Sequence, residues 1–355
     1  MLAKARIRTG WSRVKVSWWP ILQAAAAAGL AYWFSGEVLG HANPLFAPIA
    51  AWMTLGFTAD RELRRMLELG LGVALGVGLG DLVVHLIGSG VAQLSVVLFV
   101  AALIARFLDR GILFTTQAGV QALVVVALPP EGYGGPLGRW TDALTGVGIA
   151  IIVSLLTPGD PRRKARIEAN EALHTVAEVI RHTSLAIRFF DREEIALATA
   201  IGRKATTTLE DWHSITRNAR EFARISPAQT QIEPELAVLE RAAERTATAM
   251  RTARTLARRA NDLVNHRIFA ASLADLLDDL AEATEQFGND LGAGQDPAVA
   301  RVRLATVANR ADPYSLGRDE WLVQGLVVLV RSLVVDLQEA AGASETESRD
   351  ALPEI

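Results

Sequence analysis

The chain of 355 residues contains no cysteine, and this absence excludes several kinds of chemistry. Without cysteine the protein has no disulfide, no thiolate nucleophile and no cysteine-ligated metal. Its six histidines are dispersed and form no His-Glu-x-x-His pair, so we expect no metal site. The sequence also lacks a Gly-x-x-x-x-Gly-Lys-Ser/Thr phosphate loop and a Gly-x-Ser-x-Gly nucleophile motif. These absences predict that the protein is not an enzyme, binds no cofactor and has no ATP-driven motor of its own.

Charged residues are scarce in the first 158 positions, whereas the remainder is rich in Arg, Asp and Glu. This division predicts a membrane domain followed by a soluble domain. The first uncharged run lies between Lys15 and Glu37. Aromatic residues stand near its two ends, as they do at bilayer interfaces: Trp18, Trp19, Tyr32 and Trp33. Five more apolar runs follow, at about residues 41–58, 66–87, 91–106, 111–128 and 140–157, and Pro129–Pro130 and Pro158–Gly159 stop the last two. We therefore predict six membrane spans.

Basic residues predict the orientation of these spans, because Lys and Arg resist translocation. They cluster in the amino-terminal arm, in alternate loops and after the sixth span: Lys4, Arg6, Arg8, Arg13, Lys15, Arg61, Arg64, Arg65, Arg106, Arg110, Arg162, Arg163, Lys164 and Arg166. The opposite loops hold only Arg139, beside Glu37, Glu131 and the uncharged Gly88–Ser89–Gly90 turn. Both termini should face the cytoplasm. A cleaved signal peptide is the alternative interpretation of the basic arm, and the five further spans disfavour it.

The second half shows apolar residues at helical spacing and no strand-like run, which predicts a helical bundle. We expect helices at about 161–190, 192–224, 233–264, 267–291, 297–310 and 316–341. The apolar run Leu326–Val335 is too short to span a bilayer and contains Arg331, so we interpret it as a core helix. The fold class is thus all-α: a cytoplasmic basic arm (1–17), a six-helix transmembrane domain (18–158), a cytoplasmic helical domain (159–342) and a disordered tail (343–355).

The third span carries the most informative motif of the chain. Arg64 and Arg65 lead into an apolar helix with Glu68 just inside it, and glycines follow Glu68 at four-residue steps: Gly72, Gly76 and Gly80. Glycines on one face permit close helix packing, which is the commoner role, and they can also line a pathway. Ionisable groups inside a bilayer are costly and suggest an ion or solute path, although Glu68 and Arg64 could also form an interfacial ion pair.

Other polar residues extend the candidate pathway. Asp81 and His85 are four residues apart and share a helix face, where they could exchange a proton or simply reach interfacial water. Gln117 and Gln121 of the fifth span could bind a carboxylate or an adjoining helix. Asp142, near Arg139 at the start of the sixth span, could cap that span or gate it. In the second half, a basic set on one helix (Arg251, Arg254, Arg258 and Arg259) is offset by glutamates on the same helix, so we expect a solvated face and no nucleic acid partner.

The motif Arg64-Arg65-x-x-Glu68-x-x-x-Gly72-x-x-x-Gly76 resembles the fusaric acid resistance and aromatic acid exporter superfamily. The family pattern is Glu-Arg-x-x-Gly-Thr-x-x-Gly, and this chain has Leu69 in place of the arginine and Val73 in place of the threonine. The segment from Asn43 to Trp52 also resembles the second span of that family. The resemblance implies export of small organic, often aromatic, carboxylates across the cytoplasmic membrane of a bacterium.

We expect two copies to form a homodimer around the solute path, because a single six-span bundle leaves little room for one. Two alternatives stay open. The plant aluminium-activated malate transporter family has a similar layout and conducts organic anions, so the chain could be an anion channel. It could also be a membrane-anchored scaffold that presents its helical domain to a soluble partner.

Overall fold

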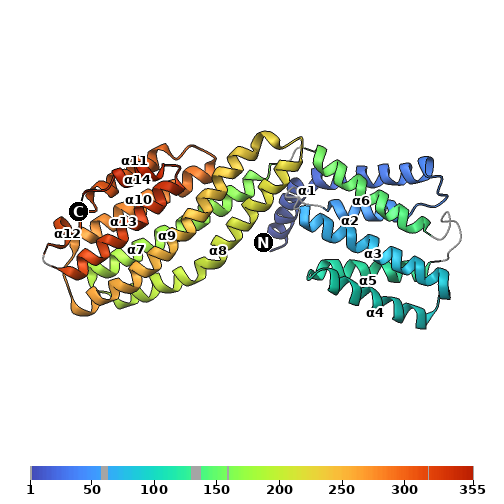
Figure 1. Cartoon of the computed structure of the whole chain (residues 1–355), viewed down its shortest axis with the longest axis horizontal. Helices are drawn as coiled ribbons and strands as arrows, with labels where there is room; N and C mark the ends of the chain where they lie inside the picture. The colour runs from blue at the N-terminus through green and yellow to red at the C-terminus, as the bar shows by residue number, and fades with distance from the viewer. Residues whose placement is uncertain (1, 57–62, 129–136, 158–159, 319, 355) are drawn as a thin grey trace. The chain divides into compact units, whose positions relative to one another are not determined.

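The computed structural model describes residues 2–56, 63–128, 137–157, 160–318 and 320–354, and within these ranges the chain forms helices and no β-strand (Figure 1). Arg61, Glu131 and the predicted breaks at Pro129–Pro130 and Pro158–Gly159 lie outside the described residues. The chain divides into two compact units. The first unit comprises 1–161 and 222–230, and the second comprises 162–221 and 231–355.

The first unit contains α1 (Leu2–Trp33), the π-helix η1 (Phe34–Val38), α2 (Phe46–Leu55), α3 (Leu63–Ile87), α4 (Val91–Leu108), α5 (Ile112–Ala127) and α6 (Gly138–Leu156). Helix α3 packs on α5 and on α6, α2 packs on α6 and α1, and α4 lies at the edge beside α5 (Figure 1). Phe99 and Phe107 of α4 are 66% and 90% exposed. An apolar helix with outward-facing aromatic side chains suits contact with lipid.

Small side chains make up much of the core of the first unit. Alanines of α1, α2 and α6 meet in one buried cluster, which includes Ala27, Ala47 and Ala150. Small residues let helix backbones approach closely, which favours packing where the surrounding solvent is as apolar as the side chains.

Among the described residues, four helices are long and apolar enough to cross a membrane: α3 from Arg64, α4, α6 and α13 (Trp321–Ala340). Helices α2 and α5 are apolar but shorter. The span predicted over 41–58 contains a helix shorter than the span, and residues 57–58 lie outside the described residues. Helix α2 has 10 residues, so it rises about 15 Å against a hydrocarbon core of about 30 Å. It ends at Gly56, whose φ of 68° breaks the helix, and the backbone between η1 and Phe46 is not helical.

The second unit contains α7 (Arg162–Phe189), most of α8 (Arg192–Ile225), α9 (Glu233–His266), α10 (Ala271–Ala293), α11 (Ala298–Arg310), α12 (Pro313–Gly317), α13 and α14 (Glu345–Asp350), with a short 3-10 helix, η2 (Thr230–Ile232), before α9. Helix α7 packs on α10 and α9, and α13 packs on α9. The helices predicted for this half are confirmed, with ends that differ by a few residues.

Helix α13 combines the composition of a membrane span with the packing of a core helix. Val327, Val330 and Leu333 are fully buried. The Arg331 guanidinium, which interrupts the apolar run, donates hydrogen bonds to the carbonyl oxygens of Ala311 and Pro353, both at 2.9 Å. These contacts support our interpretation of α13 as a core helix.

The segment after Gly342 differs from the disordered tail that its composition predicts. Ser344 and Glu347 form a capping box at the start of α14. The Ser344 hydroxyl accepts from the Glu347 amide at 3.2 Å, and a Glu347 carboxylate oxygen accepts from the Ser344 amide at 2.8 Å. Reciprocal capping satisfies two backbone donors and stabilises a helix that has no apolar face.

Candidate functional site

A cluster of four buried or nearly buried ionisable side chains lies at one end of the first unit. The first turns of α6 carry Arg139 and Asp142, which are three residues apart and therefore on one helix face. Arg139 Nε lies 3.9 Å from Asp81 Oδ1 of α3, and His41 Nδ1 lies 2.7 Å from Asp142 Oδ1. The exposed fractions of the Arg139 and Asp142 residues are 1% and 0%. We call Asp81, Arg139, Asp142 and His41 the ionic cluster.

Arg139 also binds the end of α5. Its two terminal nitrogens donate to the carbonyl oxygens of Val125 at 2.8 Å and Leu128 at 3.4 Å. The last carbonyls of a helix have no partner within the helix, and a cation there also interacts favourably with the helix dipole. Arg139 therefore caps α5 while its charge compensates Asp81.

His41 reaches the ionic cluster from the non-helical segment between η1 and α2. Its backbone amide donates to the Ser35 carbonyl at 3.1 Å, and Ser35 in η1 is fully buried. π-Helical turns occur frequently at functional sites. Sequence reasoning did not select His41 because its segment shows no periodic pattern. The available signal was a lone histidine next to Asn43 and Pro44 in an otherwise uncharged run.

The other predicted charges, Arg64, Arg65 and Glu68, lie in the first turns of α3. The Arg64 Nε donates to Glu68 Oε1 at 2.9 Å, and both Arg64 and Arg65 are exposed. A methyl carbon at Gly111 would lie 3.0 Å from Glu68 Oε2, so the carboxylate sits over the first turn of α5. Glu68 thus faces both an arginine and the positive end of a helix dipole.

The glycines of α3 face α5. A methyl carbon would lie 2.8 Å from the Phe114 carbonyl oxygen at Gly72, 2.9 Å from Ala118 Cα at Gly76, and 2.9 Å from Val125 Cβ at Gly80. These positions permit contact between the α3 and α5 backbones, which larger side chains would prevent. The structure therefore places all three glycines in helix packing.

The members of the two predicted polar pairs have different surroundings. Asp81 is 7% exposed and lies 3.9 Å from Arg139, and the charge of the exposed His85 also acts on it. Gln121 Nε2 donates to Met53 Sδ at 3.3 Å, and Gln117 lies where Gly72 approaches α5. Among the described residues, the side-chain carbonyl oxygens of Gln117 and Gln121 have no hydrogen-bond donor although both are enclosed. A buried acceptor without a donor is costly, so both side chains are candidates for a hydrogen bond from a ligand or a water.

Comparison with known proteins identifies the family of this chain. Residues 30–153 match the family described as fusaric acid resistance protein-like. An uncharacterized protein of Corynebacterium glutamicum is 30% identical over 351 residues, which cover 91% of this chain and 85% of that protein. Proteins of Mycobacterium tuberculosis and Mycobacterium bovis named "putative arylamide transporter" are 30% identical over 314 residues, which cover 84% of this chain and 86% of theirs. The chain belongs to the fusaric acid resistance protein-like family.

In this family member, the matched segment runs from Leu30 in α1 to Val153 in α6 and includes the whole ionic cluster. The family and the apolar helices together identify a multi-pass membrane protein of bacteria. The predicted resemblance is confirmed, and the departures at Leu69 and Val73 are compatible with membership.

The second unit also brings together three possible metal ligands. One ligand atom each of His213, Glu240 and Glu244 lies within 4.8 Å of the other two. Glu240 accepts from Arg220 at 2.7 Å, so a cation there would compete with a guanidinium. Sequence reasoning missed this group because His213 comes from α8 and the glutamates come from α9. The four-residue step between the two glutamates was the only local signal.

Proposed function

We propose that the protein is a membrane transporter that exports small organic carboxylates, aromatic ones among them, across the bacterial cytoplasmic membrane. Family membership and the relatives named as arylamide transporters support transport. The observation that carries the proposal is the ionic cluster. Each charged group within a bilayer costs about 2.5–3.5 kcal/mol on insertion scales, and such groups mark ion or solute paths.

The proposed path follows the interface of α3 with α5 and α6. It begins at Arg64, Arg65 and Glu68, passes the amide groups of Gln117 and Gln121, and reaches Asp81 and Arg139. Glu68 and Asp81 are separated by about 20 Å of helical rise, most of the hydrocarbon thickness of about 30 Å. Arg139 supplies the guanidinium that recognises a carboxylate, and His41 lies in the same cluster through Asp142.

We place both termini in the cytoplasm and propose six passes through the membrane. The distribution of Lys and Arg supports this orientation. The short α2 is compatible with a pass because it packs inside the unit against α1, α3 and α6, and non-helical backbone is tolerated at membrane depth where protein surrounds it. A homodimer of first units would enclose the path.

The membrane potential suffices to drive this export. A potential negative inside favours outward movement of an anion by about 2.3 kcal/mol per charge per 100 mV. Exposed Arg64 and Arg65 would attract cytoplasmic anions within a Debye length of about 8 Å at physiological salt. Transport therefore needs no ATP-driven partner.

Flux of labelled aromatic carboxylates in vesicles that contain the full chain tests this function. We expect Arg139→Gln and Asp142→Asn to reduce potential-driven flux at least tenfold, because each removes one charge of the ionic cluster. Ser95→Ala, an exposed position of α4, is the matched control and should transport normally. Size-exclusion profiles verify that each variant is folded. Wild-type vesicles without flux, or cluster variants that transport as fast as the control, would reject the proposal.

A further inference from the structure

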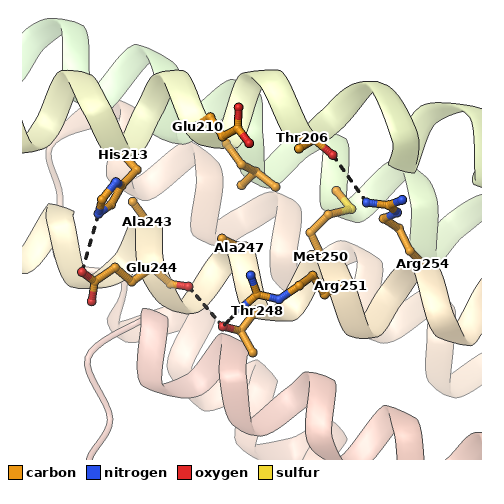
Figure 2. Close-up of a pocket in the computed structure, with 11 residues that line it drawn as sticks. Thr206, Glu210, His213, Ala243, Glu244, Ala247, Thr248, Met250, Arg251 and Arg254 are labelled. Carbon is orange, nitrogen blue, oxygen red and sulfur yellow. Dashed lines mark hydrogen bonds and ion pairs between the residues drawn. The ribbon is translucent and has the colours of Figure 1, made fainter.

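The second unit carries a groove of about 570 Å³ between α8 and α9, shown in Figure 2. This volume lies within the range of about 300–1,000 Å³ typical of small-molecule sites. Nothing in the proposed transport path uses this groove, since all of its lining residues belong to the second unit.

The floor of the groove is apolar. Leu209 of α8 and Met250 of α9 contribute side chains that are 6% and 2% exposed, and Ala243 and Ala247 keep the α9 side shallow. The methionine thioether contacts aromatic rings favourably, and small alanines leave room for a flat group. The floor therefore suits an aromatic ring.

One end of the groove is basic. Arg251 and Arg254 are three residues apart on α9 and share a face. Arg251 Nη2 donates to Thr248 Oγ1 at 2.9 Å, and Arg254 Nη1 donates to Thr206 Oγ1 at 3.4 Å (Figure 2). Each guanidinium group contacts a hydroxyl, and the charge of Arg251 also acts on the Asp336 carboxylate of α13. Guanidinium groups suit the binding of a carboxylate.

The other end carries acceptors. His213 Nε2 and Glu244 Oε1 lie 3.6 Å apart, and Glu210 stands on the rim (Figure 2). Glu244 and Arg251 are seven residues apart on α9, about 10 Å along its axis, and the Arg251 side chain turns back to Thr248 (Figure 2). Both signs of charge therefore line the same apolar floor, where one substituted ring can meet both.

We propose that this groove binds an aromatic carboxylate that carries an amino or amide N–H at the opposite end of the ring. The carboxylate binds Arg251 and Arg254, the ring covers Met250 and Leu209, and the N–H donates to Glu244. This class overlaps the anions proposed as cargo, so the groove gives the second unit a means to sense them. The binding itself is independent of whether the first unit transports.

Calorimetric titration of the full chain in detergent with 4-acetamidobenzoate tests the groove. We expect saturable binding to the groove, and at least a tenfold loss of affinity for this site in the Arg251→Gln/Arg254→Gln double variant. The matched control is Arg258→Gln/Arg259→Gln, which removes two exposed arginines of the same helix and should bind as wild type. Glu244→Gln should weaken binding of 4-acetamidobenzoate and leave benzoate unaffected, since benzoate has no N–H to donate.

Three outcomes would overturn the assignment: no saturable binding to wild type, equal loss in the control variant, or full affinity in the groove variant. Asp81→Asn separates this inference from the proposed function. That substitution lies in the ionic cluster and should stop transport while the groove keeps its affinity. If Asp81→Asn abolishes binding, the ligand occupies the first unit and the groove assignment fails.

Discussion

A single methyl group at Gly76 tests the closest contact between α3 and α5. In Gly76→Ala the new carbon would lie 2.9 Å from both the Cα and the carbonyl carbon of Ala118, and closer still to the carbonyl oxygen. All three are backbone atoms of a helix, so none can rotate away. Ordinary contact begins at 3.4 Å, so the two carbon contacts alone require the helices to separate by about 0.5 Å, and the carbonyl oxygen requires more.

The cost of this separation follows from its effect on the whole interface. A gap of about 0.5–1 Å forfeits a quarter to a half of the dispersion energy of each contact that it opens. The contacts of Gly72 with Phe114 and of Gly80 with Val125 would open together with that of Gly76. Overpacking typically lowers the free energy of unfolding by about 1–3 kcal/mol, and we take a value near 3 because the clashing atoms belong to rigid backbone. Alanine has a better helix propensity than glycine, which offsets about 1 kcal/mol. The expected net destabilisation is about 2 kcal/mol.

Thermal unfolding of the purified chain in detergent measures this loss. We expect the midpoint of the first unit to fall by about 4–8 °C in Gly76→Ala. Gly148→Ala in α6 is the matched control, because its methyl carbon meets no atom within 4 Å. Equal midpoints for the two variants would refute the packing argument. Rescue of Gly76→Ala by Ala118→Gly would also refute it, since removing the Ala118 methyl leaves the clashing backbone in place.

Three further predictions concern charged groups. Arg139→Gln should destabilise the first unit by about 3–5 kcal/mol because Asp81 is left buried without its cation, and adding Asp81→Asn should restore at least half of the loss in denaturant titrations. Burial raises the pKa of Glu168 in α7, so ionisation of this carboxyl destabilises the fold as pH rises through the folded pKa. Glu168→Gln should therefore raise the unfolding midpoint at pH 7. A gain that persists below about pH 4, where the carboxyl is protonated in both states, would contradict this cause. Burial opposes ionisation of Glu235, but hydrogen bonds from two arginines of α7 outweigh it and lower its pKa. Its stabilisation is therefore present above the unfolded value of about 4.3 and lost as pH falls through the folded pKa, so Glu235→Gln should lower the midpoint at pH 7 and leave it unchanged near pH 3 in parallel melts.

The helices of the second unit could be predicted because their signals are local. Apolar residues recur at helical spacing, and breaks such as Ser226–Pro227 and Asp312–Pro313 end the pattern where the helices end. The tail shows the limit of the same approach. Its composition indicates disorder, and only the three-residue spacing of Ser344 and Glu347 indicates a capped helix.

The short α2 could not be predicted from hydropathy. The mean hydropathy of residues 41–58 records how apolar they are, but it does not report whether their backbone is helical. The helix starts late because the chain leaves η1 in a non-helical path through Pro44, and it stops early because Gly56 adopts a positive φ. Proline and glycine at the two ends were visible, but their effect depends on neighbouring helices that supply the missing backbone partners.

The candidate site was predictable only where its partners are close in sequence. Arg64 and Glu68 are one turn apart, and the expected pair is present. The same four-residue rule pairs Asp81 with His85, whose charge does act on Asp81. The rule gives no sign of Arg139, which reaches Asp81 from another helix. His41 and Asp142 are likewise joined only by the tertiary fold.

Stability alone gives no reason for the ionic cluster to exist. Well-packed apolar residues of similar volume are often neutral or stabilising in place of a buried ion pair, and the first unit already packs α3 on α5 and α6 through glycines and small side chains. Arg139 donates to two carbonyl oxygens at the end of α5, and its Nε lies 3.9 Å from Asp81 Oδ1. Under the proposed function, a substrate carboxylate would compete with Asp81 for the guanidinium while the cap of α5 stays in place. Such an exchange would let the ionic cluster bind and release an anion without displacing the helices around it.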